Sequence, residues 1–213
     1  MMHNNLLPIM KEAFKPLAIA VIGFVLASLL GCEILEFLFF VFFVMTLYMY
    51  RNPERLSPSF QDASIVSPVD GIVSSIEEIE DPEYGYLLEI ESGYLDVGVL
   101  RFPFSGTVVD FQIKRGTRLS SRFSLSSKLN ERGILTLQDK ANNSLKIEHM
   151  LKQSFADLCV DLERSRDITQ GRRYGFMLYG VTKVYLPQNF RMGLKVGDEV
   201  KASDSLIGYF TQK

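Results

Sequence analysis

The sequence contains no tryptophan, and only two cysteines and two histidines are present among its 213 residues. Cys32 and Cys159 are far apart and form neither a CxxC pair nor a metal-ligand spacing, so no metal site is predicted. Cys32 lies in an apolar run, so a disulfide bond is not expected, and a reducing compartment fits the polar part of the chain. The formal net charge is −2, and without a basic surplus a nucleic-acid partner is not expected.

The sequence has an excess of apolar residues in two segments near the N-terminus, 17–32 and 34–50. Each would form a helix of roughly 24 Å. This is slightly shorter than the ~30 Å helix of ~20 residues that crosses a bilayer comfortably. The segment FLFFVFFVM has no polar face at a helical period, which disfavours a hairpin buried in a soluble core. A second apolar segment disfavours a cleaved signal peptide. We expect a transmembrane or re-entrant helical hairpin with its turn at residues 31–36.

Charges around this hairpin predict its orientation. Basic residues flank both ends and acidic residues lie in the turn: Lys11, Lys15, Arg51 and Arg55, against Glu33 and Glu36. Because positive residues favour the cytoplasmic side, both ends are expected there. The expected location is therefore a bacterial-type inner (cytoplasmic) membrane, with the soluble domain facing the cytoplasm. The predicted organisation is a tail and hairpin over 1–50, a proline-containing linker over 51–60 and a β domain over 61–213.

The remainder of the chain has the alternating pattern of β-strands. Short β-rich runs are separated by Gly, Pro, Asn and Asp, at 71–79, 84–92, 107–113, 133–139, 144–151 and 182–187. This spacing predicts a mainly β sandwich or barrel. Residues 151–165 are compatible with a short helix. The segment LKVGDEVKASDSLIG resembles the end of a barrel-sandwich hybrid domain, the fold of biotinyl and lipoyl carriers, but the chain lacks their Met-Lys-Met motif.

Several motifs in a fixed order resemble the short prokaryotic form of phosphatidylserine decarboxylase over about residues 15–210. They are RNPER, SPVDGIV, LDVGVLRFPFSGTV, LNER, QGRRYGFMLYG, KVYLP and KVGDEVKASDSLIG. The resemblance implies self-cleavage, in which a serine after glycine attacks the preceding carbonyl and elimination leaves a pyruvoyl group. That group would form a Schiff base with the substrate amine and accept electrons as carbon dioxide leaves. An Asp-His-Ser arrangement would assist the cleavage.

The motifs carry over at one of three catalytic positions. SPVDG places Asp70 at the acid position, whereas LDVGV places Gly98 where the histidine is expected. MLYGVTKVYLP places Val181 where the serine is expected, and one residue is missing between Val181 and Leu186. No pyruvoyl cofactor is expected, because Val181 follows Gly180 and has no hydroxyl group. Asp70 is equally suited to a turn, so its role stays open between the two.

Two other residues come into question as substitutes for the lost groups. The chain has no Gly-Ser dipeptide, but shifting the alignment by one residue brings Thr182 to the cleavage position, where it would yield a 2-oxobutanoyl group. Val181 would then stand where the cleavage turn favours glycine. His149 lies in an alternating run, SLKIEHML, and is expected to be an ordinary strand residue.

Three functions remain in competition. The first is a membrane-bound, non-catalytic relative of the decarboxylase that binds phosphatidylserine or phosphatidylethanolamine, or assembles with lipid-synthesis enzymes, as a possible homodimer. The second is an active phosphatidylserine decarboxylase that releases CO2 to give phosphatidylethanolamine. The third is a carrier-like or scaffold module of the cell envelope. The basic cluster KRGTRLSSR, with Arg115 and Arg118, would suit anionic head groups, although mixed surface charge is also normal for solubility.

Overall fold

The computed structural model describes residues 7–55, 63–120, 123, 125–162 and 167–211. The chain divides into two compact units, Met1–Glu54 and Arg55–Lys213. This boundary lies within the segment 51–60 that the sequence suggests as a linker, and residues 56–60 of that segment lie outside the described residues.

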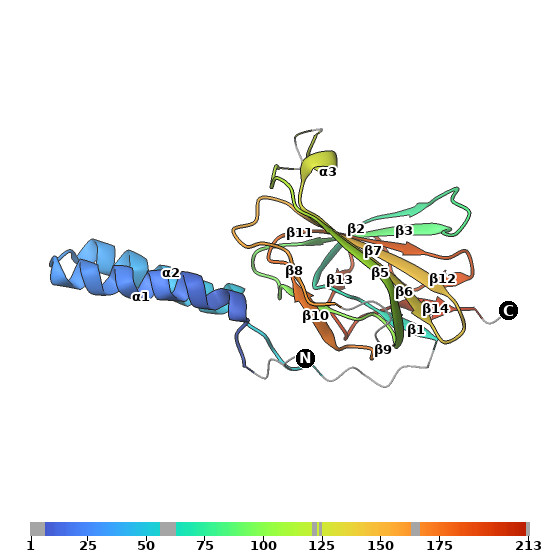
Figure 1. Ribbon diagram of the computed structural model, residues 1–213, viewed down its shortest axis with the longest axis horizontal. Helices are drawn as coiled ribbons and strands as arrows, with labels where there is room; N and C mark the ends of the chain where they lie inside the picture. Colours follow the sequence, from blue (N-terminus) through green and yellow to red (C-terminus); the bar gives the residue numbers. More distant parts are fainter. Residues whose placement is uncertain (1–6, 56–62, 121–122, 124, 163–166, 212–213) are drawn as a thin grey trace. The chain divides into compact units, whose positions relative to one another are not determined.

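The first unit is a helical hairpin (Figure 1). A 3-10 turn, η1 (Lys11–Ala13), leads into α1 (Phe14–Leu29), and α2 (Glu33–Met49) follows after three residues. The turn is therefore shorter than the expected 31–36, because Glu33 and Glu36 belong to the first turn of α2. Carboxylates are favoured there by the positive end of the helix dipole. Gly31 adopts φ 65° just after α1, which is the usual way for glycine to end a helix.

Small residues bring the two helices together. Ala13, Ala20 and Ala27 of the first unit are buried at intervals of seven residues. At Gly23, an added Cβ would lie 2.2 Å from the Phe39 ring, so only glycine permits this approach. Among the described residues, one segment, Lys11–Leu29, is long and apolar enough to cross a membrane. Apolar side chains on the outside of both helices are exposed, as lipid contact requires.

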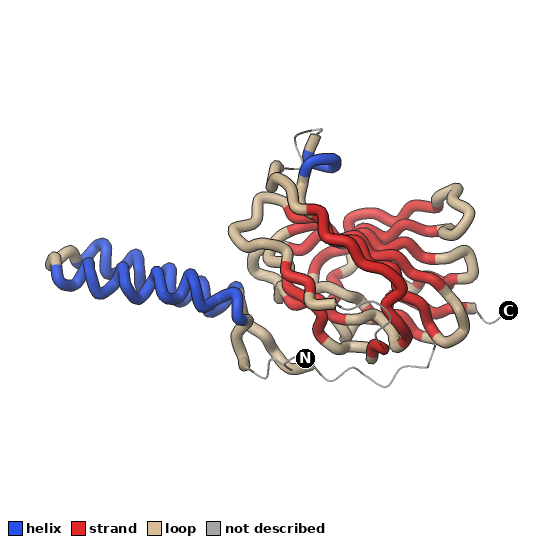
Figure 2. Tube along the Cα trace, in the orientation of Figure 1, coloured by secondary structure: helices blue, strands red, loops and turns tan. Residues whose placement is uncertain are grey.

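The second unit is built almost entirely of antiparallel strands (Figures 1 and 2). Its strands are β1 (Ser64–Val66), β2 (Gly71–Glu78), β3 (Tyr86–Ser92), β4 (Val99–Arg101), β5 (Gly106–Lys114), β6 (Arg132–Asp139), β7 (Ser144–Leu151), β8 (Cys159–Val160), β9 (Asp167–Ile168), β10 (Arg173–Phe176), β11 (Gly180–Leu186), β12 (Phe190–Met192), β13 (Glu199–Val200) and β14 (Leu206–Phe210). The large sheet has the order β13-β2-β3-β11-β7-β6-β5-β9, and two three-stranded sheets have the orders β1-β14-β12 and β4-β10-β8. The predicted mainly β fold is confirmed, with open sheets over the described residues.

The six predicted strands correspond to β2, β3, β5, β6, β7 and β11. Their alternation turns one set of side chains inward, as in β7, where Leu145, Ile147 and Leu151 are fully buried. The suggested helix at 151–165 is wrong for the described part, since Leu151 ends β7 and residues 159–160 form β8. A four-residue helix, α3 (Ser126–Leu129), is instead present before β6.

Candidate functional site

The Gly180 region begins strand β11, which lies between β3 and β7 in the large sheet. Gly180 is opposite Ser92 on one side and Leu151 on the other. An added Cβ at Gly180 would lie 2.4 Å from the Met150 carbonyl oxygen and 2.8 Å from the Met177 sulfur. This crowding alone explains why residue 180 is glycine, whether or not the segment has a catalytic role. Val181 is the next residue, and it is 8% exposed.

Gly98, at the expected histidine position, lies beside the same segment. The Met177 amide donates a 2.8 Å hydrogen bond to the Gly98 carbonyl oxygen. An added Cβ at Gly98 would lie 2.7 Å from Cε2 of Phe176 and 2.8 Å from the Met177 carbonyl oxygen. The Phe176 ring therefore fills the space that any side chain at position 98 would need.

Asp70 also reaches this region, through its backbone. Its carbonyl oxygen accepts a 2.6 Å hydrogen bond from the hydroxyl of Ser92, the residue opposite Gly180. The Asp70 carboxylate is bound to the Arg55 guanidinium through both oxygens, one at 2.6 Å. The Ala202 amide donates a further 2.8 Å hydrogen bond to the same carboxylate. The hydrogen bond to Asp70 raises the pKa of Arg55. The structure thus brings the segments of the three motif positions near one another and pairs the Asp70 carboxylate with Arg55.

Thr182 and His149 meet in the interior of the β unit. The Thr182 hydroxyl lies 2.8 Å from Nδ1 of His149, and the Tyr174 hydroxyl lies 2.7 Å from Nε2. Thr182 and His149 have no exposed surface. Burial lowers the pKa of His149 to about 3 and raises the pKa of Tyr174, so the imidazole is neutral. A hydroxyl beside a neutral imidazole is a nucleophile-base pair by type, but this pair is closed to any bound substrate.

Arg55 and Tyr174 are the site-adjacent residues that sequence reasoning missed. Arg55 lies in the RNPER motif, where its position beside the hairpin suggests a membrane-flanking charge; the motif itself is the signal that points to a further role. The Tyr174 contact joins residues 25 positions apart, and no local pattern encodes it. Within the basic cluster, Arg115 and Arg118 bind the buried Glu131, and Arg118 also binds Asp157. Their charge is largely neutralised within the protein.

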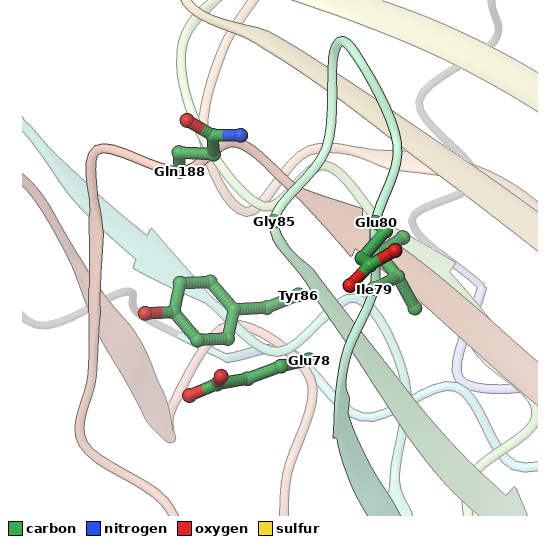
Figure 3. A pocket seen from close by; sticks show the side chains of 6 residues that line it. All are labelled: Glu78, Ile79, Glu80, Gly85, Tyr86 and Gln188. Carbon is green, nitrogen blue, oxygen red and sulfur yellow. The ribbon is translucent and has the colours of Figure 1, made fainter.

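A polar hollow of about 460 Å³ lies at the other end of β11 (Figure 3). Its lining is Glu78, Ile79, Glu80, Gly85, Tyr86 and Gln188. Glu78 and Tyr86 are cross-strand partners, and Tyr86 is opposite Leu186. Gly180 is six residues away along the strand, or roughly 20 Å. The hollow is therefore separate from the motif positions. Within the described ranges, no group of three His, Cys, Asp or Glu side chains is arranged to hold a metal ion.

The residues at the cleavage position do not fit a pyruvoyl group. Such a group derives from a side-chain oxygen or sulfur on the residue after Gly180, and Val181 carries only carbon and hydrogen there. The nearest hydroxyl along the strand is that of Thr182, which is bonded to His149 in the core.

Comparison with known proteins agrees with the motif order. The family model for phosphatidylserine decarboxylase matches residues 42–208. A phosphatidylserine decarboxylase proenzyme from Geotalea uraniireducens (strain Rf4) is 30% identical over 212 residues, covering 97% of this chain and 99% of that protein. A proenzyme of the same description from Ehrlichia chaffeensis is 26% identical over 215 residues, covering 98% and 94%. One from Desulfotalea psychrophila is 27% identical over 206 residues, covering 94% and 96%.

Proposed function

Because the chain belongs to the phosphatidylserine decarboxylase family, we propose that it is a membrane-anchored member that does not self-process and that acts by binding phospholipid. Phosphatidylserine and phosphatidylethanolamine are the lipids that the relatives' chemistry suggests. Its partners would be membrane phospholipids and, through them, lipid-synthesis enzymes, with a homodimer as one possible assembly.

The observation that carries this proposal is the side chain after Gly180. Both the attack on the preceding carbonyl and the later elimination pass through a β-oxygen, and Val181 has none. The position expected to hold a histidine is Gly98, and the Phe176 ring occupies the adjacent space. The loss of the nucleophile is therefore accompanied by packing that fills the place of its base.

An active decarboxylase is the second candidate, and the contact between Thr182 and His149 favours it. Cleavage before Thr182 would leave a 2-oxobutanoyl group. Against this candidate, Thr182 is paired through β11 to β3 and β7 on both sides, and its side chain has no exposed surface. A carbonyl group formed there would need a substantial opening of the sheet before a lipid amine reached it.

Membrane attachment is supported by the segment Lys11–Leu29, which is long and apolar enough to span a bilayer. Basic residues flank the hairpin on both ends, and acidic residues lie in the first turn of α2, next to the hairpin turn. We extend this to an inner-membrane location with both ends of the hairpin, and hence the β unit, on the cytoplasmic side.

Intact mass spectrometry of the purified full-length chain tests the proposal. We expect one species at the full 24.2 kDa, and no CO2 release from carboxyl-labelled phosphatidylserine in mixed micelles. The Geotalea relative serves as the positive control. Two fragments that together account for the whole mass, or a new chain end that reacts with hydroxylamine, would refute the proposal. The cleavage position, before Val181 or before Thr182, would then identify the residue that acts.

A further inference from the structure

The β unit exposes a group of large apolar side chains at the end of the sheet that holds Gly180. Leu95, Phe123, Leu125, Leu129 and Phe155 are each between 47% and 81% exposed, with Phe155 the most exposed. Exposed apolar side chains gathered in this way usually mark an interaction site rather than ordinary surface. We call these five residues and Tyr94 the aromatic end surface.

An ordered stack of three rings forms the centre of this surface. The Phe155 ring lies 5.3 Å from the Tyr94 ring, centroid to centroid, and Tyr94 lies 4.6 Å from the Tyr179 ring. The Tyr94 hydroxyl donates to the Gln153 carbonyl oxygen, and the Lys152 amide donates to the Tyr179 carbonyl oxygen at 3.2 Å. The exposed Phe155 ring is therefore supported from below by the rings of Tyr94 and Tyr179. Tyr179 is the residue directly before Gly180.

Hydrogen bonds bring the separate loops to the same place. The Arg118 guanidinium donates to the Ser154 carbonyl oxygen at 3.2 Å. The Asn130 amide group donates to the carbonyl oxygens of Leu119, at 2.8 Å, and Leu151, at 2.9 Å. The loop that contains α3 is thus fastened to the start of the loop that contains Phe155. Figure 1 shows α3 at an extremity of the β unit, beyond the ends of β5 and β6.

Three basic residues near this surface are paired with carboxylates. Arg115 and Arg118 bind Glu131, and Lys152 binds Glu91. The charge of these three residues is therefore balanced within the protein, and the apolar and aromatic side chains carry the interaction. Phe and Tyr rings beside paired basic groups suit the interfacial zone of a bilayer, where one end of a ring is apolar and the other is wet.

A short chain segment connects the hairpin to the β unit, and its length favours the bilayer as the partner of this surface. Arg55, which is bound to Asp70 in the β unit, is six residues after Met49, the last residue of α2. Six residues span at most about 22 Å. The β unit therefore stays close to the bilayer that contains the hairpin, at a high effective concentration of lipid.

We propose that the aromatic end surface docks into the interface of the bilayer in which the hairpin is anchored, which places the Gly180 end of the sheet against lipid head groups. This inference rests on the membrane anchoring in the proposed function, but it does not depend on whether the chain self-processes.

The absence of tryptophan makes a sharp test available. Phe155→Trp introduces a single indole at the centre of the surface. Ala141→Trp introduces one in the exposed turn between β6 and β7, at the opposite end of these strands. Both full-length variants are reconstituted in phosphatidylcholine–phosphatidylserine vesicles with or without acyl-chain bromine, which quenches indole on contact. We expect quenching at position 155 at least about twofold stronger than at position 141, because only the former enters the interface.

Three results would overturn the docking surface: equal quenching at both positions, no quenching at position 155, or a blue shift at position 155 that follows protein concentration rather than lipid, which would indicate a second copy of the chain. Far-UV circular dichroism of both variants verifies that each is folded. Intact mass spectrometry of the same samples reports self-processing separately, so failure of the proposed function is distinguished from failure of this inference.

Discussion

At the residue scale, His149 is a titratable group with no exposed surface, lying between the Thr182 and Tyr174 hydroxyl groups. Burial lowers its pKa to about 3, whereas an unfolded histidine has a pKa of about 6.5. Between these two values the unfolded chain binds a proton that the folded chain does not. The contribution of His149 to stability is therefore constant above about pH 6.5 and falls as the pH drops, by at most ~1.4 kcal/mol per unit.

We predict that His149→Gln lowers the unfolding free energy at pH 7, because it disturbs two buried hydrogen bonds, but weakens the loss of stability below pH 6.5. The difference between wild type and variant should shrink by about 1 kcal/mol or more between pH 7 and pH 5. Urea unfolding followed by circular dichroism measures it. His3→Gln, at the only other histidine, is the matched control. A difference that stays constant with pH would contradict a neutral His149.

The same residues show which part of the site a sequence encodes. The departures from the expected motifs at Gly98 and Val181 can be read directly from the sequence, because each falls inside a short motif with a fixed order. The Phe176 ring against Gly98 and the Arg55 pair of Asp70 are not visible, since both contacts depend on how distant segments pack. Burial of Thr182 follows from alternation in β11, but its contact with His149 depends on the register of β7 against β11.

At the element scale, alternation predicts the long strands because one face of each is buried and the other is wet. Whether a short segment forms a helix or a loop depends instead on its contacts with distant parts of the chain. Helix α3 has only four residues, and the segment after Leu151 forms a loop held by Tyr94 and Arg118 rather than the suggested helix. The expected hairpin turn is longer than the observed one, because two glutamates suggest a loop, whereas in the structure they lie in the first turn of α2.

Close packing of α1 on α2 gives the second prediction. Ala20 is 1% exposed, so Ala20→Leu would force extra carbon atoms into a filled interface and should cost about 1–3 kcal/mol of hairpin stability. Loss of helical circular dichroism during titration with SDS in mixed micelles measures the change. Ile19→Leu, at a neighbouring exposed position, should leave the transition within error. Equal behaviour of the two variants would mean that Ala20 does not lie in the helix interface.

At the scale of the whole molecule, the division into two units is reflected in the contacts of Arg55. Its guanidinium binds the Asp70 carboxylate and donates a 3.0 Å hydrogen bond to the Ala202 carbonyl oxygen. The side chains of Arg55 and Asp70 are 14% and 10% exposed. The first residue of the β unit therefore joins the start of β2 to the segment before β14, and the unit has its own core of strands without the hairpin.

We predict that a fragment of residues 54–213 folds on its own, with a strand-type circular dichroism spectrum and one cooperative unfolding transition. A fragment of residues 63–213 lacks Arg55. In this fragment the nearly buried Asp70 carboxylate loses its guanidinium partner and keeps the hydrogen bond from the Ala202 amide. Removal of one partner from such a pair should cost about 3 kcal/mol or more. Urea unfolding of the two fragments measures this loss, and Arg55→Ala in the longer fragment should reproduce most of it. If the longer fragment does not fold, or if Arg55→Ala leaves its stability unchanged, the Arg55–Asp70 pair does not hold the β unit together in the way its geometry indicates.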